Sequence, residues 1–182
     1  MNARLTLLSI IILLAAGCIT KEDNIRDNME KISISADGFK EGDTIPDEFT
    51  CNGKDISPSL SWKGIPAGTK SIALIMDDPD ASGGPFVHWV LYNMPAGIQK
   101  LPEGMPRNQT LSDGSMQGMT DFGQPGYGGP CPPPGKPHRY YFKVYALDIN
   151  LGLPPGASKD QLESAMQGHI LAKGELMGKY QG

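Results

Sequence analysis

The stretch Arg-Tyr-Tyr-Phe-Lys-Val-Tyr-Ala-Leu-Asp at residues 139–148 is the longest β-strand candidate in the chain, and it sets the fold class. Aromatic and β-branched residues of this kind are typical of strands. Three other segments have strand character: residues 32–35 alternate Ile with Ser, residues 71–76 form a short apolar run, and residues 86–94 are aromatic and β-branched. These segments predict a mostly β protein.

One helix is predicted, late in the chain. Ser158 followed by Gln161 has the spacing of a capping box, which marks a helix start. Four residues then share one face: Leu162, Ala165, Met166 and His169. We interpret His169 as a packing histidine whose polar atoms are satisfied. Several strands with one helix predict an antiparallel β-sandwich with a small number of short helices.

Composition agrees with one soluble domain. The chain has 182 residues, of which 39% are hydrophobic and 20% charged, enough to build a packed core. The 23 glycines and 16 prolines favour a turn-rich β fold over a helical bundle. Sixteen basic and 20 acidic residues give a net charge of −4. The chain therefore lacks the excess positive charge that proteins use to bind nucleic acid.

The N-terminus resembles a bacterial export signal. Arg4 precedes an apolar run at residues 5–16, which ends at Ala15-Ala16-Gly17-Cys18. We expect residues 1–17 to be a signal peptide and Cys18 to be lipidated, with plain secretion and an uncleaved anchor as alternatives. Residues 18–31 would then be a tether and residues 32–182 the domain, held outside the cytoplasm at a membrane.

Residues 93–137 form a long stretch without periodicity, in which 18 of 45 residues are Gly or Pro. Loops of this length are uncommon in compact domains unless they are functional or disordered. Met119, Phe122 and Tyr127 supply apolar groups for packing. We therefore expect an ordered, functional loop.

Three clusters next to the predicted strands carry candidate chemistry. They are Asp77-Asp78-Pro79-Asp80, His88-Trp89, and the glycine- and proline-rich residues 128–135 that lead into His138-Arg139-Tyr140. Imidazoles near carboxylates are expected to stay partly protonated, and glycine-rich backbone offers free N–H groups. Together these clusters predict a pocket for phosphate or a phosphomonoester.

Each cluster also has a structural interpretation. Residues 77–80 have the composition of a simple turn. His88 is equally well explained as a hydrogen-bonded core histidine. Arg139 fits a structural ion pair with a turn carboxylate better than a ligand contact.

The order and spacing of several motifs resemble the phosphatidylethanolamine-binding protein family, in particular its prokaryotic branch of Raf-kinase-inhibitor-like proteins. The resemblance runs from about Ile32 to Tyr180. The matching pieces are Thr50-Cys51-Asn52-Gly53, Ser57-Pro58-Ser59-Leu60-Ser61-Trp62, Asp78-Pro79-Asp80, His88-Trp89, Asp121-Phe122-Gly123, and residues 126–140.

The resemblance implies an antiparallel β-sandwich with a small anion-binding cavity. It places four residues around this cavity: Asp78, His88, His138 and Tyr140. It also implies that Asp80 supports the cavity and that Gly129 and Pro130 lie on its rim.

The expected function is non-enzymatic binding of phosphate, a phosphorylated small molecule or a phospholipid head group, without a cofactor. The alternative is an inhibitor that acts on a protease or kinase through surface loops. A hydrolase is a third hypothesis, although the chain lacks the Gly-x-Ser-x-Gly motif that holds the nucleophilic serine in many hydrolases. Metal-ligand spacings such as Cys-x-x-Cys are also missing. A homodimer remains an open alternative.

Two cysteines remain if Cys18 carries lipid. Cys51 and Cys131 would then lie in an oxidising compartment, where such a pair usually forms a disulfide. Two buried, inert thiols are the alternative, because free cysteine behaves as a small hydrophobic residue.

Overall fold

The computed structural model describes residues 30–182. The predicted signal peptide, Cys18 and the tether up to residue 29 lie outside this range. The first strand, β1 at Glu30–Lys31, begins just before the predicted domain start at residue 32. Within residues 30–182, no helix is long and apolar enough to cross a membrane.

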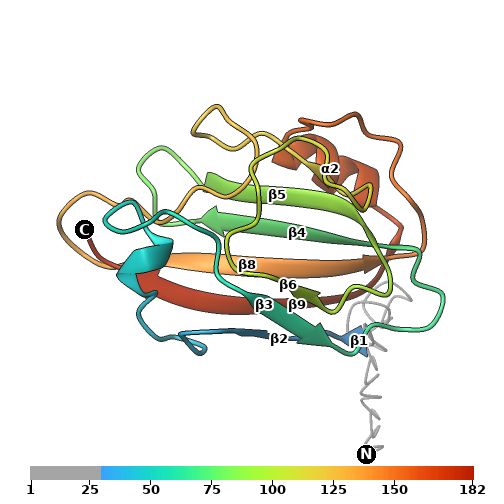
Figure 1. Ribbon diagram of the computed structural model, residues 1–182, viewed down its shortest axis with the longest axis horizontal. Helices are drawn as coiled ribbons and strands as arrows, with labels where there is room; N and C mark the ends of the chain where they lie inside the picture. Colours follow the sequence, from blue (N-terminus) through green and yellow to red (C-terminus); the bar gives the residue numbers. More distant parts are fainter. Residues whose placement is uncertain (1–29) are drawn as a thin grey trace, which may run out of the picture.

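Two sheets make up the fold (Figure 1). The six-stranded main sheet has the order β1-β9-β8-β4-β5-β7, and the three-stranded small sheet has the order β2-β3-β6. All pairs are antiparallel except β1 with β9. The other elements are β2 Ser33–Ala36, η1 Asp47–Phe49, β3 Leu60–Lys63, β4 Ser71–Asp78, β5 Phe86–Pro95, β6 Lys100–Leu101, β7 Met116–Gln117, β8 His138–Leu147, α2 Lys159–Met166 and β9 Ile170–Tyr180.

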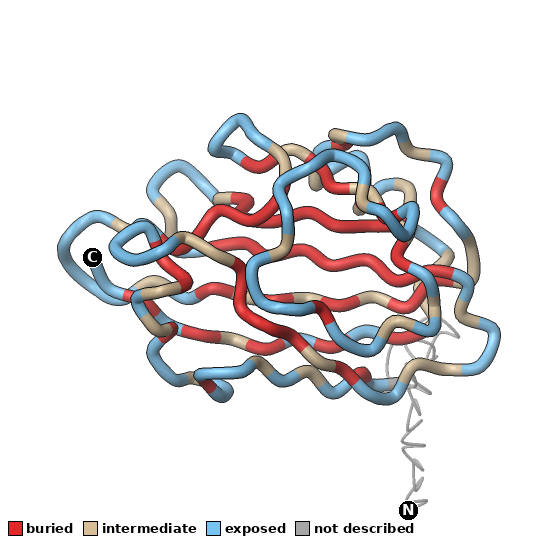
Figure 2. The backbone as a smooth tube through the Cα atoms, in the orientation of Figure 1, coloured by how far each residue is buried: buried red, intermediate tan, exposed pale blue. Residues whose placement is uncertain are grey.

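Buried residues run along the strands of the main sheet (Figure 2). Its two faces pack against separate cores, which gives the domain three layers. One core lies between the two sheets, where Trp62 of the small sheet joins Leu74 and Phe142 of the main sheet. A second core lies between the main sheet and α2, and it contains Ile75 and Leu162. The predicted β-sandwich is therefore confirmed.

Strand β4 is the central strand of this arrangement. All eight of its residues are buried, because β5 and β8 flank it and both of its faces are covered. A strand covered on both sides is expected to be continuously apolar and not alternating. This explains the unbroken apolar run at residues 71–76.

Sequence patterns did not predict the longest strand, β9. Its inward-facing positions alternate correctly, but two of them are glycines, so the apolar signal is interrupted. A side chain at Gly174 would collide with the backbone oxygen of Ile32, and one at Gly178 would collide with the side chain of Ile45. Glycine therefore marks a close approach between β9 and the N-terminal segment.

The predicted helix is present, and its capping box is formed. Ser158 accepts from the backbone N–H of Gln161, whose side chain accepts from the N–H of Ser158. The helix ends at Met166, so the prediction that His169 lies on its apolar face is wrong. His169 follows the helix, is 40% exposed on its side chain and pairs with Asp148 at 2.8 Å.

The long segment at residues 93–137 is ordered, and it contains β6 and β7. Gln117 of β7 is fully buried and holds the segment to the main sheet. Its amide oxygen accepts from the Trp89 indole at 2.8 Å, and its amide nitrogen donates to the carbonyls of Pro106 and Asn108. The expectation of an ordered loop is therefore confirmed.

Candidate functional site

One edge of the main sheet carries the candidate site. Strand β4 ends at Asp78 there, and its antiparallel neighbours β5 and β8 both start there. A cavity of about 250 Å³ opens at this edge. Its lining contains four of the predicted residues: Asp78, His88, His138 and Tyr140. The antiparallel topology thus brings together side chains that are far apart in the sequence.

Asp78 orients His138. The carboxylate oxygen Oδ2 of Asp78 lies 2.7 Å from Nδ1 of His138, and its other oxygen accepts from the backbone N–H of Asp80 at 2.8 Å. The Asp78 side chain is 4% exposed and that of His138 is 14% exposed. A carboxylate only accepts, so Nδ1 carries a hydrogen, and Nε2 of His138 has no hydrogen-bond partner among residues 30–182.

His88 is a buried histidine and also part of the cavity lining. Its Nδ1 lies 2.7 Å from the carbonyl oxygen of Gly128, so Nδ1 donates there. Burial lowers the pKa of His88, and the opposing effects of the Gly128 carbonyl and the Asp78 charge are smaller. The expectation that both imidazoles stay partly protonated is therefore wrong for His88, because desolvation outweighs the nearby carboxylate.

Tyr140 offers an unpaired donor to the cavity. The residue is fully buried, and its hydroxyl makes no hydrogen bond of ordinary geometry among the described residues, although it lies near the Asp78 carboxylate. Burial, and next the charge of Asp78, raise its pKa well above the ordinary value. The phenol therefore keeps its proton at physiological pH and can donate to a ligand.

Aromatic rings form another wall of the cavity. Phe122 lies 4.8 Å from Phe86 and 5.3 Å from His88, measured between ring centroids. Phe122 is also 42% exposed, the one exposed large hydrophobic residue within 30–182. The sequence predicts Phe122 as a packing group of the long loop and as part of the Asp121-Phe122-Gly123 motif, but no local pattern places it at the cavity.

The three other predicted site residues do not line this cavity. The backbone N–H of Gly129 donates to Asp55 at 2.7 Å, and the carbonyl of Pro130 accepts from the N–H of Cys51 at 3.1 Å. Cys131, Pro132 and Pro133 take the lining positions instead, and a disulfide joins Cys131 to Cys51.

Asp80 lies outside the cavity and pairs with Arg139. Its two carboxylate oxygens accept from Nη2 and Nε of Arg139 at 2.6 and 2.8 Å. This bidentate hydrogen bonding lowers the pKa of Asp80 to about 2. The structural interpretation of Arg139 thus describes the observed contact.

These motifs and this fold can be compared with known proteins. The model of the family described as phosphatidylethanolamine-binding protein matches residues 35–181. The chain belongs to this family. A "UPF0098 protein" of Aquifex aeolicus is 51% identical over 151 residues, covering 82% of this chain and 88% of the relative. One of Methanothermobacter thermautotrophicus is 48% identical over 149 residues, covering 82% and 98%.

Solved structures of the family share the fold. Escherichia coli YbcL, described as a member of the mammalian phosphatidylethanolamine-binding protein family, is 35% identical with a TM-score of 0.78. A family homologue from Chlamydia trachomatis is 39% identical with a TM-score of 0.76. Each comparison covers 84% of this chain and 99% of the other. The family resemblance seen in the sequence motifs is thus confirmed.

Proposed function

We propose that this chain is a non-enzymatic binding protein whose cavity takes phosphate or a phosphorylated head group. One observation carries the proposal: the buried Tyr140 hydroxyl lines the cavity without a partner, beside a histidine that Asp78 holds in place. A buried polar group without a partner costs free energy unless a ligand satisfies it. The cavity volume of about 250 Å³ suits a small head group.

A monoprotonated phosphate matches the polar groups of the cavity. Tyr140 donates to a phosphate oxygen, and neutral His88 leaves Nε2 as an acceptor because Nδ1 holds the hydrogen. The ligand's remaining P–O–H supplies that hydrogen. A phosphomonoester loses this proton near pH 6, at about its second pKa. Affinity should therefore fall as the pH rises above about 6.

The proposal excludes covalent turnover, because the cavity offers no activated nucleophile. Cys131 forms a disulfide with Cys51, so it has no free thiol to act as a nucleophile. Ser82 lines the cavity but forms no hydrogen bond with either histidine within residues 30–182, whereas nucleophilic serines need such a base. The Tyr140 phenol keeps its proton, because burial raises its pKa.

Calorimetric titration with phosphoethanolamine and with inorganic phosphate tests the proposal. Tyr140→Phe should lower affinity about tenfold, the expected loss of a hydrogen bond to a charged group, and His138→Ala should do the same because the unpartnered Nε2 belongs to a residue of the cavity lining. Tyr140→Phe should leave thermal stability unchanged or slightly higher, because it removes an unsatisfied hydroxyl. If both variants bind like the wild type, the cavity is not the site, and the loop-mediated inhibitor becomes the better hypothesis.

A further inference from the structure

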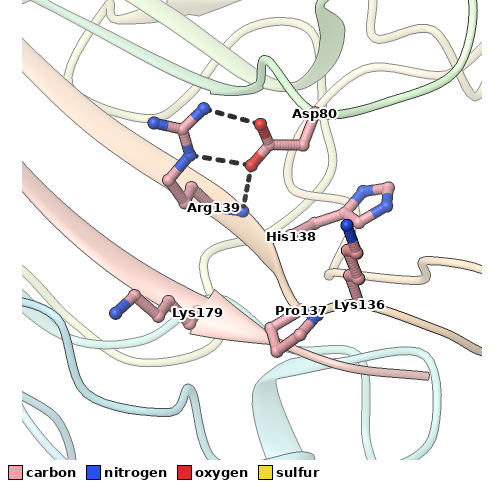
Figure 3. A pocket seen from close by; sticks show the side chains of 6 residues that line it. All are labelled: Asp80, Lys136, Pro137, His138, Arg139 and Lys179. Atoms are coloured by element: carbon pink, nitrogen blue, oxygen red, sulfur yellow. Dashed lines mark hydrogen bonds and ion pairs between the residues drawn. The ribbon is translucent and has the colours of Figure 1, made fainter.

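A second, larger cleft lies next to the cavity, and His138 lines both. This cleft has a volume of about 610 Å³. Its lining is Asp80, Lys136, Pro137, His138, Arg139 and Lys179 (Figure 3). The register of β8 with β9 places Lys179 beside Arg139, and Lys136 and Pro137 directly precede β8.

The cleft is locally positive on an acidic protein. Three of its side chains are cationic and one is a carboxylate, while the whole chain has a net charge of −4. Asp80 neutralises Arg139 through the bidentate pair drawn in Figure 3. Neither Lys136 nor Lys179 has an ion-pair partner within residues 30–182. Two uncompensated positive charges therefore remain in the cleft.

We propose that this cleft is a second anion subsite and that the ligand carries two anionic groups. One group occupies the Tyr140 cavity, and the other lies over Lys136 and Lys179. This inference rests on the proposed function of the cavity. Because His138 lines both hollows, a short linker between the two groups would pass beside this residue.

The position of the cleft favours a dissolved ligand over a membrane surface. The chain enters the described fold at β1, where Glu30 pairs with Ala172, whereas His138 pairs with Tyr180. These positions on β9 differ by 180 − 172 = 8 residues, or roughly 26 Å at the rise of a strand. Figure 1 shows β1 and the start of β8 at opposite ends of the sheet. A domain tethered at its N-terminus would thus present the cleft away from the tether.

Bisphosphonates provide a stable probe for two linked subsites. We would titrate the purified protein with alkane bisphosphonates of increasing linker length and with alkyl monophosphonates of matched length, in a phosphate-free buffer at physiological salt. Lys136→Gln and Lys179→Gln each remove one charge and leave a polar side chain that is one atom shorter. Lys173→Gln is the matched control, because Lys173 is exposed on the same strand but lines neither hollow.

The wild type should bind the best-fitting bisphosphonate about tenfold more tightly than its monophosphonate, as expected for linked binding groups. Lys136→Gln and Lys179→Gln should each reduce this ratio about threefold, since exposed ion pairs contribute modestly. Lys173→Gln should leave the ratio unchanged.

The titrations distinguish a failure of the second subsite from a failure of the proposed function. Equal affinity for both probes, with normal monophosphonate binding, would refute the second subsite and leave the proposed function intact. If neither probe binds, the proposed function itself fails. Lysine-dependent binding to anionic lipid vesicles, without a preference for bisphosphonates, would show that the cleft recognises a membrane surface.

Discussion

Tyr140 and His138 line the same cavity, but their polar groups have different surroundings. Tyr140 is left with an unpaired hydroxyl, at a cost of about 1–3 kcal/mol for a buried polar group. His138 is fully oriented, because Asp78 holds its Nδ1 at 2.7 Å. The unpaired phenol thus lowers the stability of the free protein. The fixed imidazole would lose little conformational entropy on binding a ligand, because it is already held in one orientation.

Arg139 should matter more for stability than for phosphate binding. It lies outside the cavity and lowers the pKa of Asp80 to about 2, from an ordinary value of 3.8. A carboxylate whose folded pKa is depressed stabilises the fold above its unfolded pKa, and this contribution disappears as the pH falls towards 2. Arg139→Ala should therefore be less stable than the wild type at pH 6, and the two should converge near pH 2.

Denaturant unfolding at several pH values would measure this difference. The effect at pH 6 should be small, because the pair is largely exposed to solvent. Asp80→Asn is the control and should show the same loss and the same convergence. A difference that does not change with pH would contradict the assignment to the Asp80–Arg139 pair.

Strand β4 separates two carboxylates by placing them on opposite faces of the sheet. Asp78 faces the cavity, while Asp77 accepts from Lys143 and Lys159 at 2.7 and 2.8 Å. Lys159 is the first residue of α2, so Asp77 ties the helix to the sheet. Adjacent residues of one strand thus belong to the proposed binding cavity and to an ion-pair contact with the helix, respectively.

Matched substitutions should separate these two roles. Asp77→Asn should lower the free energy of unfolding by about 1.5–3 kcal/mol, the value of hydrogen bonds to charged groups, and should leave phosphate affinity unchanged. Asp78→Asn should lower affinity about tenfold, because the His138 ring loses its carboxylate partner. Chemical denaturation and calorimetry of both variants would test this, and reduced phosphate affinity in Asp77→Asn would argue against the separation.

The disulfide between Cys51 and Cys131 joins two loops at the same end of the sheet. It spans a sequence separation of 80 residues. In the chain-entropy picture, such a bridge contributes about 4 kcal/mol. Replacing both cysteines with serine should remove most of this stability. It should also weaken phosphate binding, since Cys131 lines the cavity.

Thiol counting under denaturing, non-reducing conditions provides an independent check of the bridge. An intact disulfide should leave neither Cys51 nor Cys131 titratable. Finding both thiols free would contradict the bridge and support the alternative of two inert cysteines.

At the scale of the whole molecule, we propose that a lipid on Cys18 holds the domain at a membrane outside the cytoplasm. Cys18 follows an apolar run and small residues, as in lipidated precursors. Cys18→Ser should release the protein from the membrane fraction, while the wild type stays bound, and immunoblots of separated fractions would measure this. Continued membrane association of the variant would refute lipid anchoring.

Local sequence patterns were sufficient to predict much of the framework. Strands β4, β5 and β8 and the start of helix α2 were predicted close to their observed bounds, because each carries its signal within a few neighbouring residues. The fold class followed from these elements, and the family followed from the order of the motifs. Four cavity residues were named through the family resemblance: Asp78, His88, His138 and Tyr140.

Contacts between distant residues decided the rest. Strand β9 was missed because Gly174 and Gly178 interrupt its apolar pattern. Both glycines are required by close contacts with segments far away in the sequence, and a local pattern does not contain such contacts. The lowered pKa of His88 depends on burial by elements far along the chain. Lys179 reaches the second cleft only through the register of β9 with β8. Sequence alone determined which segments form strands and helix, whereas tertiary structure decided burial, register and charge environment, because these depend on residues brought together only by folding.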